Sequence, residues 1–412
     1  MSRMLLTDGM VFDSSTATLE GPRTVVIEGD LITSVGAEPV PAVADDEIID
    51  CTGTTILPGL IDAHVHVAVT TMDFGALAGH PESLRAIGSA RILEGMLSRG
   101  FTTVRDAGGA DAGLSAAIER GLVDGPTLLR TGRALSQTGG HGDVRTPFVA
   151  GLTCACEIAE SGIAVLADGA DAVRRAAREQ LRQGAHAIKV MASGGVASPT
   201  DPLWMEAYTP EELRAAVVEA ERRRTYVLAH AYTPGAISRA VEAGVRSIEH
   251  GNLLDVEAAE RMAEAGAALV PTLVTYWAIA EYGDAFGLPS WAVAKVGEVL
   301  DAGMESVRIA LDAGVTVGFG TDLLGEAHDL QNREFALRSE VQSPAEVIAA
   351  ATLANAHILG MEDQIGVVRA GSKADLVVVD GDPTADISLL TDPRGLDVIR
   401  GGVRRRYSSS DD

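Results

Sequence analysis

One local pattern recurs between residues 60 and 320 and constrains the fold more than any other feature of the chain. A helical stretch ends at a glycine, and a short run of β-branched or apolar residues follows at once. Glycine just past a helix is the expected stop signal, because it adopts the left-handed backbone conformation at little cost. The glycines at these junctions are Gly100, Gly184, Gly244, Gly266 and Gly314.

Alternation of helix and strand predicts parallel strands that are joined by crossovers. With residues 55–66 and 126–135 included, the pattern predicts about eight strands. Eight such units close most naturally into a (β/α)8 barrel. We therefore expect an α/β chain whose TIM-like barrel spans residues 58–361 and carries the chemistry. A doubly wound open sheet is the alternative.

The two ends of the chain have a different pattern. Residues 1–57 and 362–412 contain short strands and turns, such as the hairpin predicted over 24–35 and the strand predicted over 374–380. Neither end has enough apolar surface to fold alone. We expect the two ends to pair into one small β-sandwich domain.

Composition excludes several classes of partner. The chain has 412 residues, with 33 Lys and Arg against 58 Asp and Glu, so its formal net charge is −25. Nucleic acids and anionic membranes attract basic surfaces, so we expect neither as a partner. No apolar run reaches the length of a membrane span, and the N-terminus lacks a signal-peptide pattern, which predicts a cytoplasmic protein. Three cysteines (Cys51, Cys154 and Cys156) cannot form a disulfide framework, and we expect inert thiols.

Two histidines mark the first predicted strand. His64 and His66 occur in the segment Asp62-Ala-His-Val-His. Residues two apart on a strand point to the same face, so both imidazoles are expected to face the barrel interior. Two converging neutral imidazoles are a good start for a divalent metal site. The H-x-H pair alone is a weak motif, because such pairs also occur by chance.

Polar residues also fall within or at the end of four later strands. Lys189 lies inside an apolar run, and the strands over 227–230, 247–250 and 317–322 end at His230, His250 and Asp322. Each has a plain structural explanation when taken singly: a core histidine, a snorkelling lysine or a capping aspartate. In a (β/α)8 barrel, however, the carboxyl ends of the strands form the active face. Together these residues predict a polar cluster at one mouth of the barrel.

With these residues, the sequence resembles a known family, the amidohydrolase superfamily. It is most similar to a subgroup that contains metal-dependent Xaa-Pro dipeptidases, related dipeptide hydrolases and ochratoxin-degrading amidases. The resemblance covers nearly the whole chain. It is carried by residues 58–66 (PGLIDAHVH), 189–195 (KVMASGG), 229–232 (AHAY), 248–251 (IEHG) and 320–322 (GTD), and residues 191–202 are characteristic of the subgroup.

The resemblance implies a centre of two divalent metal ions, usually zinc, on six side chains. His64 and His66 would bind the first metal with Asp322, and His230 and His250 would bind the second. Lys189 would carry a CO2-derived carbamate that bridges both. An arginine cannot form this carbamate, which gives a reason for Lys189 in a chain with three lysines (Lys189, Lys295 and Lys373) and thirty arginines. A hydroxide bridging the two metals would attack the substrate, with Asp322 as general base and then acid.

The resemblance also suggests residues that handle substrate. His141, in a glycine-rich loop, and Tyr232, two positions after His230, would lie near the substrate carbonyl or carboxylate and donate hydrogen bonds to developing charge. Arg105 and Asp106 are expected to form a structural ion pair, with binding of a substrate carboxylate as the alternative. We do not expect the four remaining histidines to be metal ligands: His80, His186, His328 and His357. Of these, His80 and His328 lie in loops that could border the pocket.

The sequence therefore predicts a metal-dependent hydrolase of amide bonds in a small molecule, either a dipeptide or an N-acyl or N-aroyl amino acid. Hydrolysis of a cyclic amide, as in imidazolonepropionase or hydantoinase, is the alternative within enzymes, and a non-catalytic binding protein on the same fold is the alternative outside them. A homo-oligomer is expected. Aromatic residues of the loops after the strands could line the pocket: Trp204, Tyr208, Tyr276, Trp277 and Tyr282.

Overall fold

The computed structural model describes residues 3–145, 163–198, 200–286, 288 and 290–405. Cys154 and Cys156 lie outside these residues, whereas Cys51 is buried. Among the described residues, no helix combines the length and the apolar character that crossing a bilayer requires.

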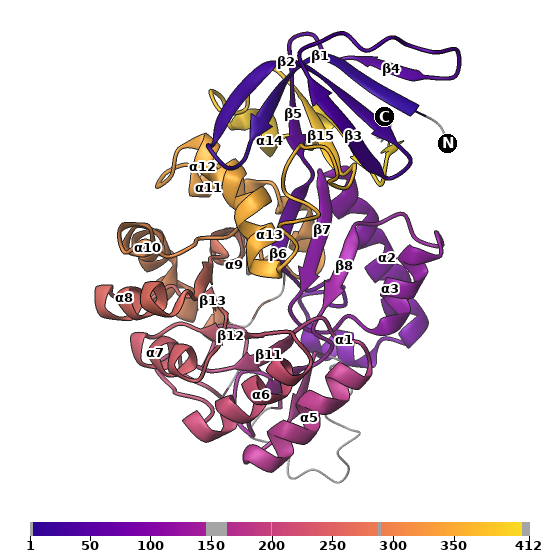
Figure 1. Cartoon of the computed structure of the whole chain (residues 1–412). Coiled ribbons are helices and arrows are strands. Elements are labelled where there is room, and N and C mark those ends of the chain that lie inside the picture. Colours follow the sequence, from indigo (N-terminus) through magenta and orange to yellow (C-terminus); the bar gives the residue numbers. More distant parts are fainter. Residues whose placement is uncertain (1–2, 146–162, 199, 287, 289, 406–412) are drawn as a thin grey trace.

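Strands from both ends of the chain pair in one sheet, and Figure 1 shows the indigo and yellow strands side by side. The sheet has the order β17-β16-β15-β5-β1-β2-β3, and β4 also pairs with β1. The antiparallel pairing of β15 with β5 joins the two ends. The predicted division into a two-sheet sandwich is not confirmed, because these strands belong to a single hydrogen-bonded sheet. Its strands are β1 (Arg3–Asp13), β2 (Thr18–Glu28), β3 (Leu31–Gly36), β4 (Glu47–Asp50), β5 (Thr54–Pro58), β15 (Leu376–Asp380), β16 (Leu396–Arg400) and β17 (Val403–Arg405).

The middle of the chain forms two parallel sheets, as the alternating pattern predicts. One has the order β6-β7-β8 and the other β10-β9-β11-β12-β13-β14. The predicted strand over 126–135 is divided into β8 and β9, and Gly132 between them has a φ of 70°. The strands are β6 (Leu60–Val65), β7 (Phe101–Asp106), β8 (Thr127–Arg130), β9 (Ala134–Ser136), β10 (Ala164–Leu166), β11 (Ile188–Met191), β12 (Val227–Ala231), β13 (Ser247–His250) and β14 (Ala268–Val270).

The last predicted barrel strand is not a regular strand, yet it touches both sheets. It forms an isolated parallel bridge between Val317 and Leu269 of β14. On the other side, the Phe319 carbonyl accepts a hydrogen bond of 2.9 Å from the backbone N–H of Ala63 in β6. The segment that leads to Asp322 therefore lies between β14 and β6. A fully closed barrel stays a prediction, because the strand ladders form two separate sheets.

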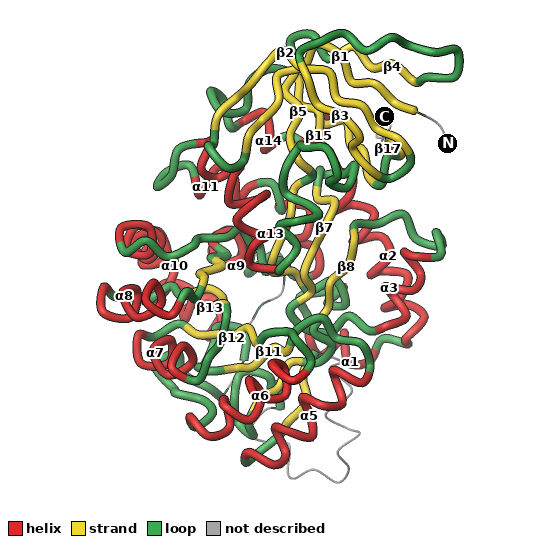
Figure 2. The backbone as a smooth tube through the Cα atoms, viewed as in Figure 1, coloured by secondary structure: helices red, strands yellow, loops and turns green. Residues whose placement is uncertain are grey.

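The helices lie outside these strands, as Figure 2 shows for the helices around β11, β12 and β13. The glycine stop signals are confirmed, since all five predicted junction glycines have positive φ, from 66° at Gly266 to 96° at Gly244. The helices are α1 (Phe74–Gly79), α2 (Glu82–Ser98), α3 (Ala112–Glu119), α5 (Ala170–Arg182), α6 (Pro210–Arg222), α7 (Pro234–Glu242), α8 (Val256–Ala265), α9 (Leu273–Tyr282), α10 (Ser290–Asp312), α11 (Arg333–Arg338), α12 (Pro344–Ala349), α13 (Asn355–Leu359) and α14 (Ser388–Thr391), with short 3-10 or π turns at Gly325–Leu330, Ala350–Ala354 and Pro393–Gly395.

A large apolar core joins the strands β11 to β14 to the helices α5 to α10. Full burial of one such aliphatic side chain stabilises the fold by about 1.5–3 kcal/mol. Five charged residues of the parallel strands are at most 1% exposed: Asp62, Arg105, Asp106, Lys189 and Glu249. Charges at such depth are costly unless they are paired or have a function, so they direct attention to this end of the strands.

Candidate metal centre and active site

The first two predicted ligands lie at the end of β6 and face each other. His64 is fully buried, His66 is 8% exposed, and their ring centroids are 5.3 Å apart. Asp62 holds this end of the strand, because its carboxylate accepts hydrogen bonds from the His64 backbone N–H (3.0 Å) and the Thr321 hydroxyl (2.6 Å). The alternation of a strand thus places both imidazoles on one side, as the sequence predicts.

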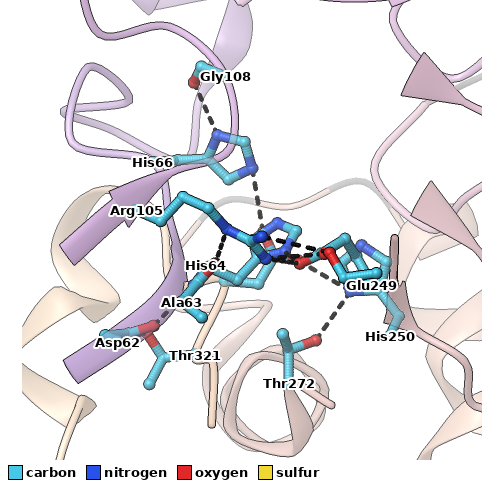
Figure 3. Close-up of polar contacts among 12 residues, drawn as sticks. Asp62, Ala63, His64, His66, Arg105, Gly108, Glu249, His250, Thr272 and Thr321 are labelled. Atoms are coloured by element: carbon cyan, nitrogen blue, oxygen red, sulfur yellow. Dashed lines mark hydrogen bonds and ion pairs between the residues drawn. The ribbon is translucent and has the colours of Figure 1, made fainter. Parts of the chain in front are cut away.

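Three of the predicted ligands form a compact cluster. One ligand atom from each of His64, His250 and Asp322 lies within 4.8 Å of the others. Asp322 Oδ1 lies 3.4 Å from His64 Nε2 and 3.3 Å from His66 Nε2. Figure 3 shows the three histidines around this point. Because these residues come from β6, β13 and the segment after β14, only the folded chain brings them together.

Two members of the cluster have a strained backbone. His250 has a φ of 72° and Asp322 a φ of 52°, which is the left-handed region that non-glycine residues rarely adopt. Such outliers cost about 1–3 kcal/mol each and concentrate at functional sites. The strain at the ends of two separate strands favours a site that is built for a ligand.

Hydrogen bonds fix one ring nitrogen of several histidines and leave the other available. Nδ1 of His66 lies 2.8 Å from the Gly108 carbonyl, and Nε2 of His230 lies 3.0 Å from the Gly194 carbonyl. A carbonyl only accepts, so these nitrogens carry the proton and the opposite nitrogens keep a lone pair. His64 donates from Nδ1 to Glu249 over 2.6 Å, and its Nε2 is buried without a hydrogen-bond partner in the described structure. This is the arrangement that a metal-binding imidazole requires.

The two other predicted ligands, His230 and Lys189, lie on the neighbouring strands β12 and β11. The His230 ring lies 4.6 Å from the His250 ring, measured between centroids. Burial holds the pKa of both histidines well below 6.5, which favours the neutral form that binds metals. Burial also lowers the pKa of Lys189 to about 8, although the negative charges of Glu249 and Asp322 oppose this shift. A lowered pKa favours the neutral amine that reaction with CO2 needs.

The structure reveals an ion pair beneath the cluster that sequence reasoning missed. Arg105 donates to both carboxylate oxygens of Glu249 at 2.8 and 2.9 Å, and to the Ala63 carbonyl at 2.6 Å. Burial alone would raise the pKa of Glu249, but the Arg105 charge and the His64 hydrogen bond outweigh it and hold the pKa well below its usual range. Glu249 is therefore a carboxylate that orients His64 (Figure 3).

The expected ion pair between Arg105 and Asp106 is thus wrong, because Arg105 pairs with Glu249 instead. Consecutive residues of a strand point to opposite faces, so Arg105 crosses the interior to Glu249 while Asp106 points elsewhere. The Asp106 carboxylate accepts hydrogen bonds from the backbone N–H groups of Val67, Gly108 and Ala110, at 2.8 to 3.0 Å. Both residues have structural partners, in agreement with the structural interpretation of Arg105.

Both predicted substrate residues lie beside the cluster. The His141 ring stacks on His230 with 4.1 Å between centroids, and the Tyr232 ring meets His230 edge-on at 4.9 Å. The Tyr232 hydroxyl is 2.7 Å from the hydroxyl of Tyr276, which is buried on α9 and not in a loop as expected. A pair of hydroxyls at this position is well placed to donate to an oxygen of a bound molecule.

The remaining aromatic residues and histidines that the sequence singled out show no hydrogen bond or ring contact with the cluster of His64, His250 and Asp322 among the described residues. Trp204 is 76% exposed and Tyr208 is buried at 1%, so neither is a clear pocket residue. His186 precedes β11, and its Nδ1 accepts a hydrogen bond of 3.3 Å from the Arg130 backbone N–H. His328 is buried, and burial lowers its pKa to about 3. The other two aromatic residues, Trp277 and Tyr282, lie on α9 and contact each other edge-on at 5.7 Å.

Comparisons with known proteins agree with this geometry. A solved structure described as a prolidase complexed with N-methylphosphonate-L-proline is 48% identical, with a TM-score of 0.95 over 98% of this chain and all of that chain. A Xaa-Pro dipeptidase structure with methionine in the active site is 28% identical, with a TM-score of 0.88 over 98% of this chain and all of that chain. The ochratoxinase of Aspergillus niger is 33% identical over 401 residues, covering 92% of this chain and 82% of the ochratoxinase.

The family model described as the amidohydrolase family matches residues 55–403. This match includes every residue of the cluster and the whole of both parallel sheets. The protein whose buried histidines meet Asp322 at the ends of these strands belongs to the amidohydrolase family.

Proposed function

We propose that this protein is a metal-dependent hydrolase of the amide bond in small dipeptides and N-acyl amino acids, with Xaa-Pro dipeptides as its first substrate class. The observation that carries the proposal is the meeting of His64, His250 and Asp322 within 4.8 Å. Both histidines are buried, and His250 and Asp322 have a strained backbone. The likeness to a prolidase at 48% identity supports the Xaa-Pro class above the ochratoxin class, whose Aspergillus niger relative is 33% identical.

The residues present suit a pair of divalent metal ions, which we propose to be zinc. His64, His66 and Asp322 would hold one ion, and His230 and His250 the other. The fit rests on the donor chemistry. His64 Nε2 is a buried nitrogen without a hydrogen-bond partner in the described structure, and hydrogen bonds at the opposite nitrogens of His66 and His230 leave one lone pair on each ring.

Lys189 is proposed to carry a carbamate. Its neutral amine adds to the carbon of CO2 and releases a proton, which leaves an anionic group with two oxygens. Neutral imidazoles bring no charge of their own, so an anionic bridge helps to balance two divalent ions. The lowered pKa of Lys189, about 8, makes the neutral amine accessible near neutral pH.

The metals, when bound, act as Lewis acids and lower the pKa of a water molecule. The protein supplies the remaining steps. Asp322 takes a proton from the attacking water and passes it to the leaving nitrogen, for which its position between His64 and His66 is suited. The Tyr232 hydroxyl donates a hydrogen bond to the substrate carbonyl or carboxylate. His141 does the same from Nε2 when that nitrogen carries a proton, since its Nδ1 is bonded to Ser198 and Asp201.

The test is a panel of Xaa-Pro dipeptides, N-acyl amino acids, ochratoxin-type amides and cyclic amides, assayed with zinc and bicarbonate. The proposal predicts turnover of Xaa-Pro dipeptides that is lost on chelation and returns when zinc is added. Asp322→Asn, which keeps the size of the side chain, is the matched inactive control. Turnover of cyclic amides alone would favour the alternative enzyme, and no turnover by metal-loaded protein would favour a binding protein.

A further inference from the structure

Lys295 is one of only three lysines in the chain, and its contacts are unusual. It lies half-buried on α10, and its ammonium donates to three backbone carbonyls: those of Gly195 (2.8 Å), Ser198 (2.9 Å) and Asp201 (2.8 Å). All three carbonyls belong to the segment after β11, here called the β11 loop, which comprises residues 193–198 and 200–205. One side chain from a distant helix thus satisfies three acceptors of one loop.

The chemistry of this contact requires lysine. An ammonium has three donors around one small atom, so it can serve carbonyls that converge on a point. A guanidinium is planar and spreads its donors over a rigid fork, which suits a carboxylate better than three converging carbonyls. In a chain with thirty arginines, lysine at this position has the same kind of explanation as Lys189.

The β11 loop is tightly folded against His141. Its own backbone is closed by a hydrogen bond of 2.9 Å from Gly194 N–H to the Met205 carbonyl. A side-chain carbon at Gly194 would lie 2.0 Å from the Pro202 carbonyl oxygen, and one at Gly195 would lie 2.1 Å from the His141 ring. The backbone of the loop therefore lies directly on the face of the imidazole, where no side chain fits.

The same loop provides the hydrogen-bond partners of His141. Its Nδ1 lies 2.6 Å from the Ser198 hydroxyl and 3.2 Å from Asp201 Oδ2. That Asp201 oxygen also accepts from the Gly195 N–H at 2.8 Å, and the residue is fully buried. The His141 ring is thus held between the loop on one side and His230 on the other.

We propose that Lys295 is a positioning residue that locks the β11 loop, so that Asp201 and Ser198 hold His141 in place beside the metal centre. Because a carboxylate only accepts, Nδ1 keeps its proton, which leaves Nε2 for the substrate, to whose oxygens it donates when it is protonated as well. The substrate role of His141 rests on the proposed function, whereas the loop contacts do not.

The test compares Lys295→Met and Lys295→Arg with Lys373→Met, a control that removes another lysine remote from the centre. Both Lys295 variants are expected to raise KM by about tenfold, the effect of losing a hydrogen bond to a charged group, while kcat and the bound metal stay close to wild type. Hydrogen exchange should become about tenfold faster at the Gly194 and Gly195 amides. Lys373→Met should change none of these quantities.

Two further measurements separate positioning from general damage. In protein labelled with 15N in the histidine rings, the His141 resonance should show a proton on Nδ1 in wild type and a mixture of tautomers in Lys295→Met. In Lys295→Ala, n-propylammonium replaces the missing atoms and should lower KM toward the wild-type value, whereas n-propanol should not.

The outcomes distinguish this proposal from the proposed function. Unchanged loop exchange and an unchanged His141 tautomer in both Lys295 variants would overturn the lock. Faster loop exchange with unchanged KM and tautomer would show an anchor that does not position His141, which also overturns it. A wild-type protein that hydrolyses no substrate of the panel would contradict the proposed function alone, since exchange and tautomer still test the lock.

Discussion

Replacing Glu249 by glutamine tests whether the buried ion pair between Glu249 and Arg105 supports the proposed metal centre. The glutamine side chain keeps an oxygen that can accept from His64 Nδ1, but it lacks the charge that Arg105 faces at 2.8 and 2.9 Å in the wild type. Arg105 is 1% exposed, so its charge would remain buried without a counter-charge. The substitution therefore changes electrostatics more than shape.

Two separate losses follow from these contacts. Breaking a buried ion pair by removing one charge costs about 3–5 kcal/mol of folding free energy. Weakening the partner of a metal-binding imidazole costs about 10–100-fold in metal affinity, which corresponds to about 1.4–2.7 kcal/mol. The double variant Glu249→Gln with Arg105→Met should recover much of the stability, because the unpaired charge is gone, but should not recover metal affinity.

Both quantities are directly measurable. Denaturant unfolding of metal-free protein gives the free energy of unfolding, and competition with a chelator gives the zinc dissociation constant. Glu334→Gln is the control for metal affinity, since Glu334 is also fully buried near an arginine but contacts the Val274 backbone instead of a predicted ligand. Wild-type zinc affinity in Glu249→Gln would refute the assigned role of the ion pair.

Three other predictions follow from the same geometry. Asp322→Asn should keep metal, measured by elemental analysis, and lose at least about a hundredfold in kcat, as expected for a lost general base; a wild-type rate would remove Asp322 from the mechanism. Lys189→Arg should lose both metal and turnover, and bicarbonate should raise zinc occupancy in wild type only; full occupancy in the variant would contradict the carbamate. Burial raises the pKa of Glu334 to about 8 despite Arg338, so the folded state binds a proton that the unfolded state releases above about pH 4.5. The unfolding free energy of metal-free wild type should therefore fall relative to Glu334→Gln by up to about 1.4 kcal/mol per pH unit between about pH 4.5 and 8, and a constant difference would contradict this.

The sequence could predict those parts of the site that depend on strand ends. His64 and His66 follow from two-residue alternation, and the stop signal at Gly244 locates the start of the strand that ends at His250. Family resemblance then assigned ligand roles, and the fold brings His64, His250 and Asp322 together. Their common position is a consequence of parallel strands, which direct all carboxyl ends to one face.

Glu249 could not be found in this way, because its contacts depend on a break in regular geometry. Glu249 and His250 are consecutive and would point to opposite faces of a regular strand. The left-handed φ of 72° at His250 ends the regular alternation, so both side chains reach the interior. The signal that could have indicated Glu249 was its charge within a strand that is otherwise uncharged before His250.

The contact of Lys295 with the β11 loop was equally hidden from the sequence. It joins residues about a hundred positions apart, and all three acceptors are backbone carbonyls, which every residue type carries. The small number of lysines suggested that each lysine position is special, but it did not show which residues Lys295 contacts. The pairing of the two ends was predictable from their short strands. The sequence did not show that these strands form one sheet, because short strands do not specify their pairing register.

The most direct test of the central claim is anomalous X-ray diffraction at the zinc absorption edge, from crystals of protein that hydrolyses a Xaa-Pro dipeptide. The account predicts two anomalous peaks per chain, one beside His64, His66 and Asp322 and the other beside His230 and His250, with density for a carbamate on Lys189 between them. Active protein with no peak at these side chains, or with metal bound elsewhere, would contradict it.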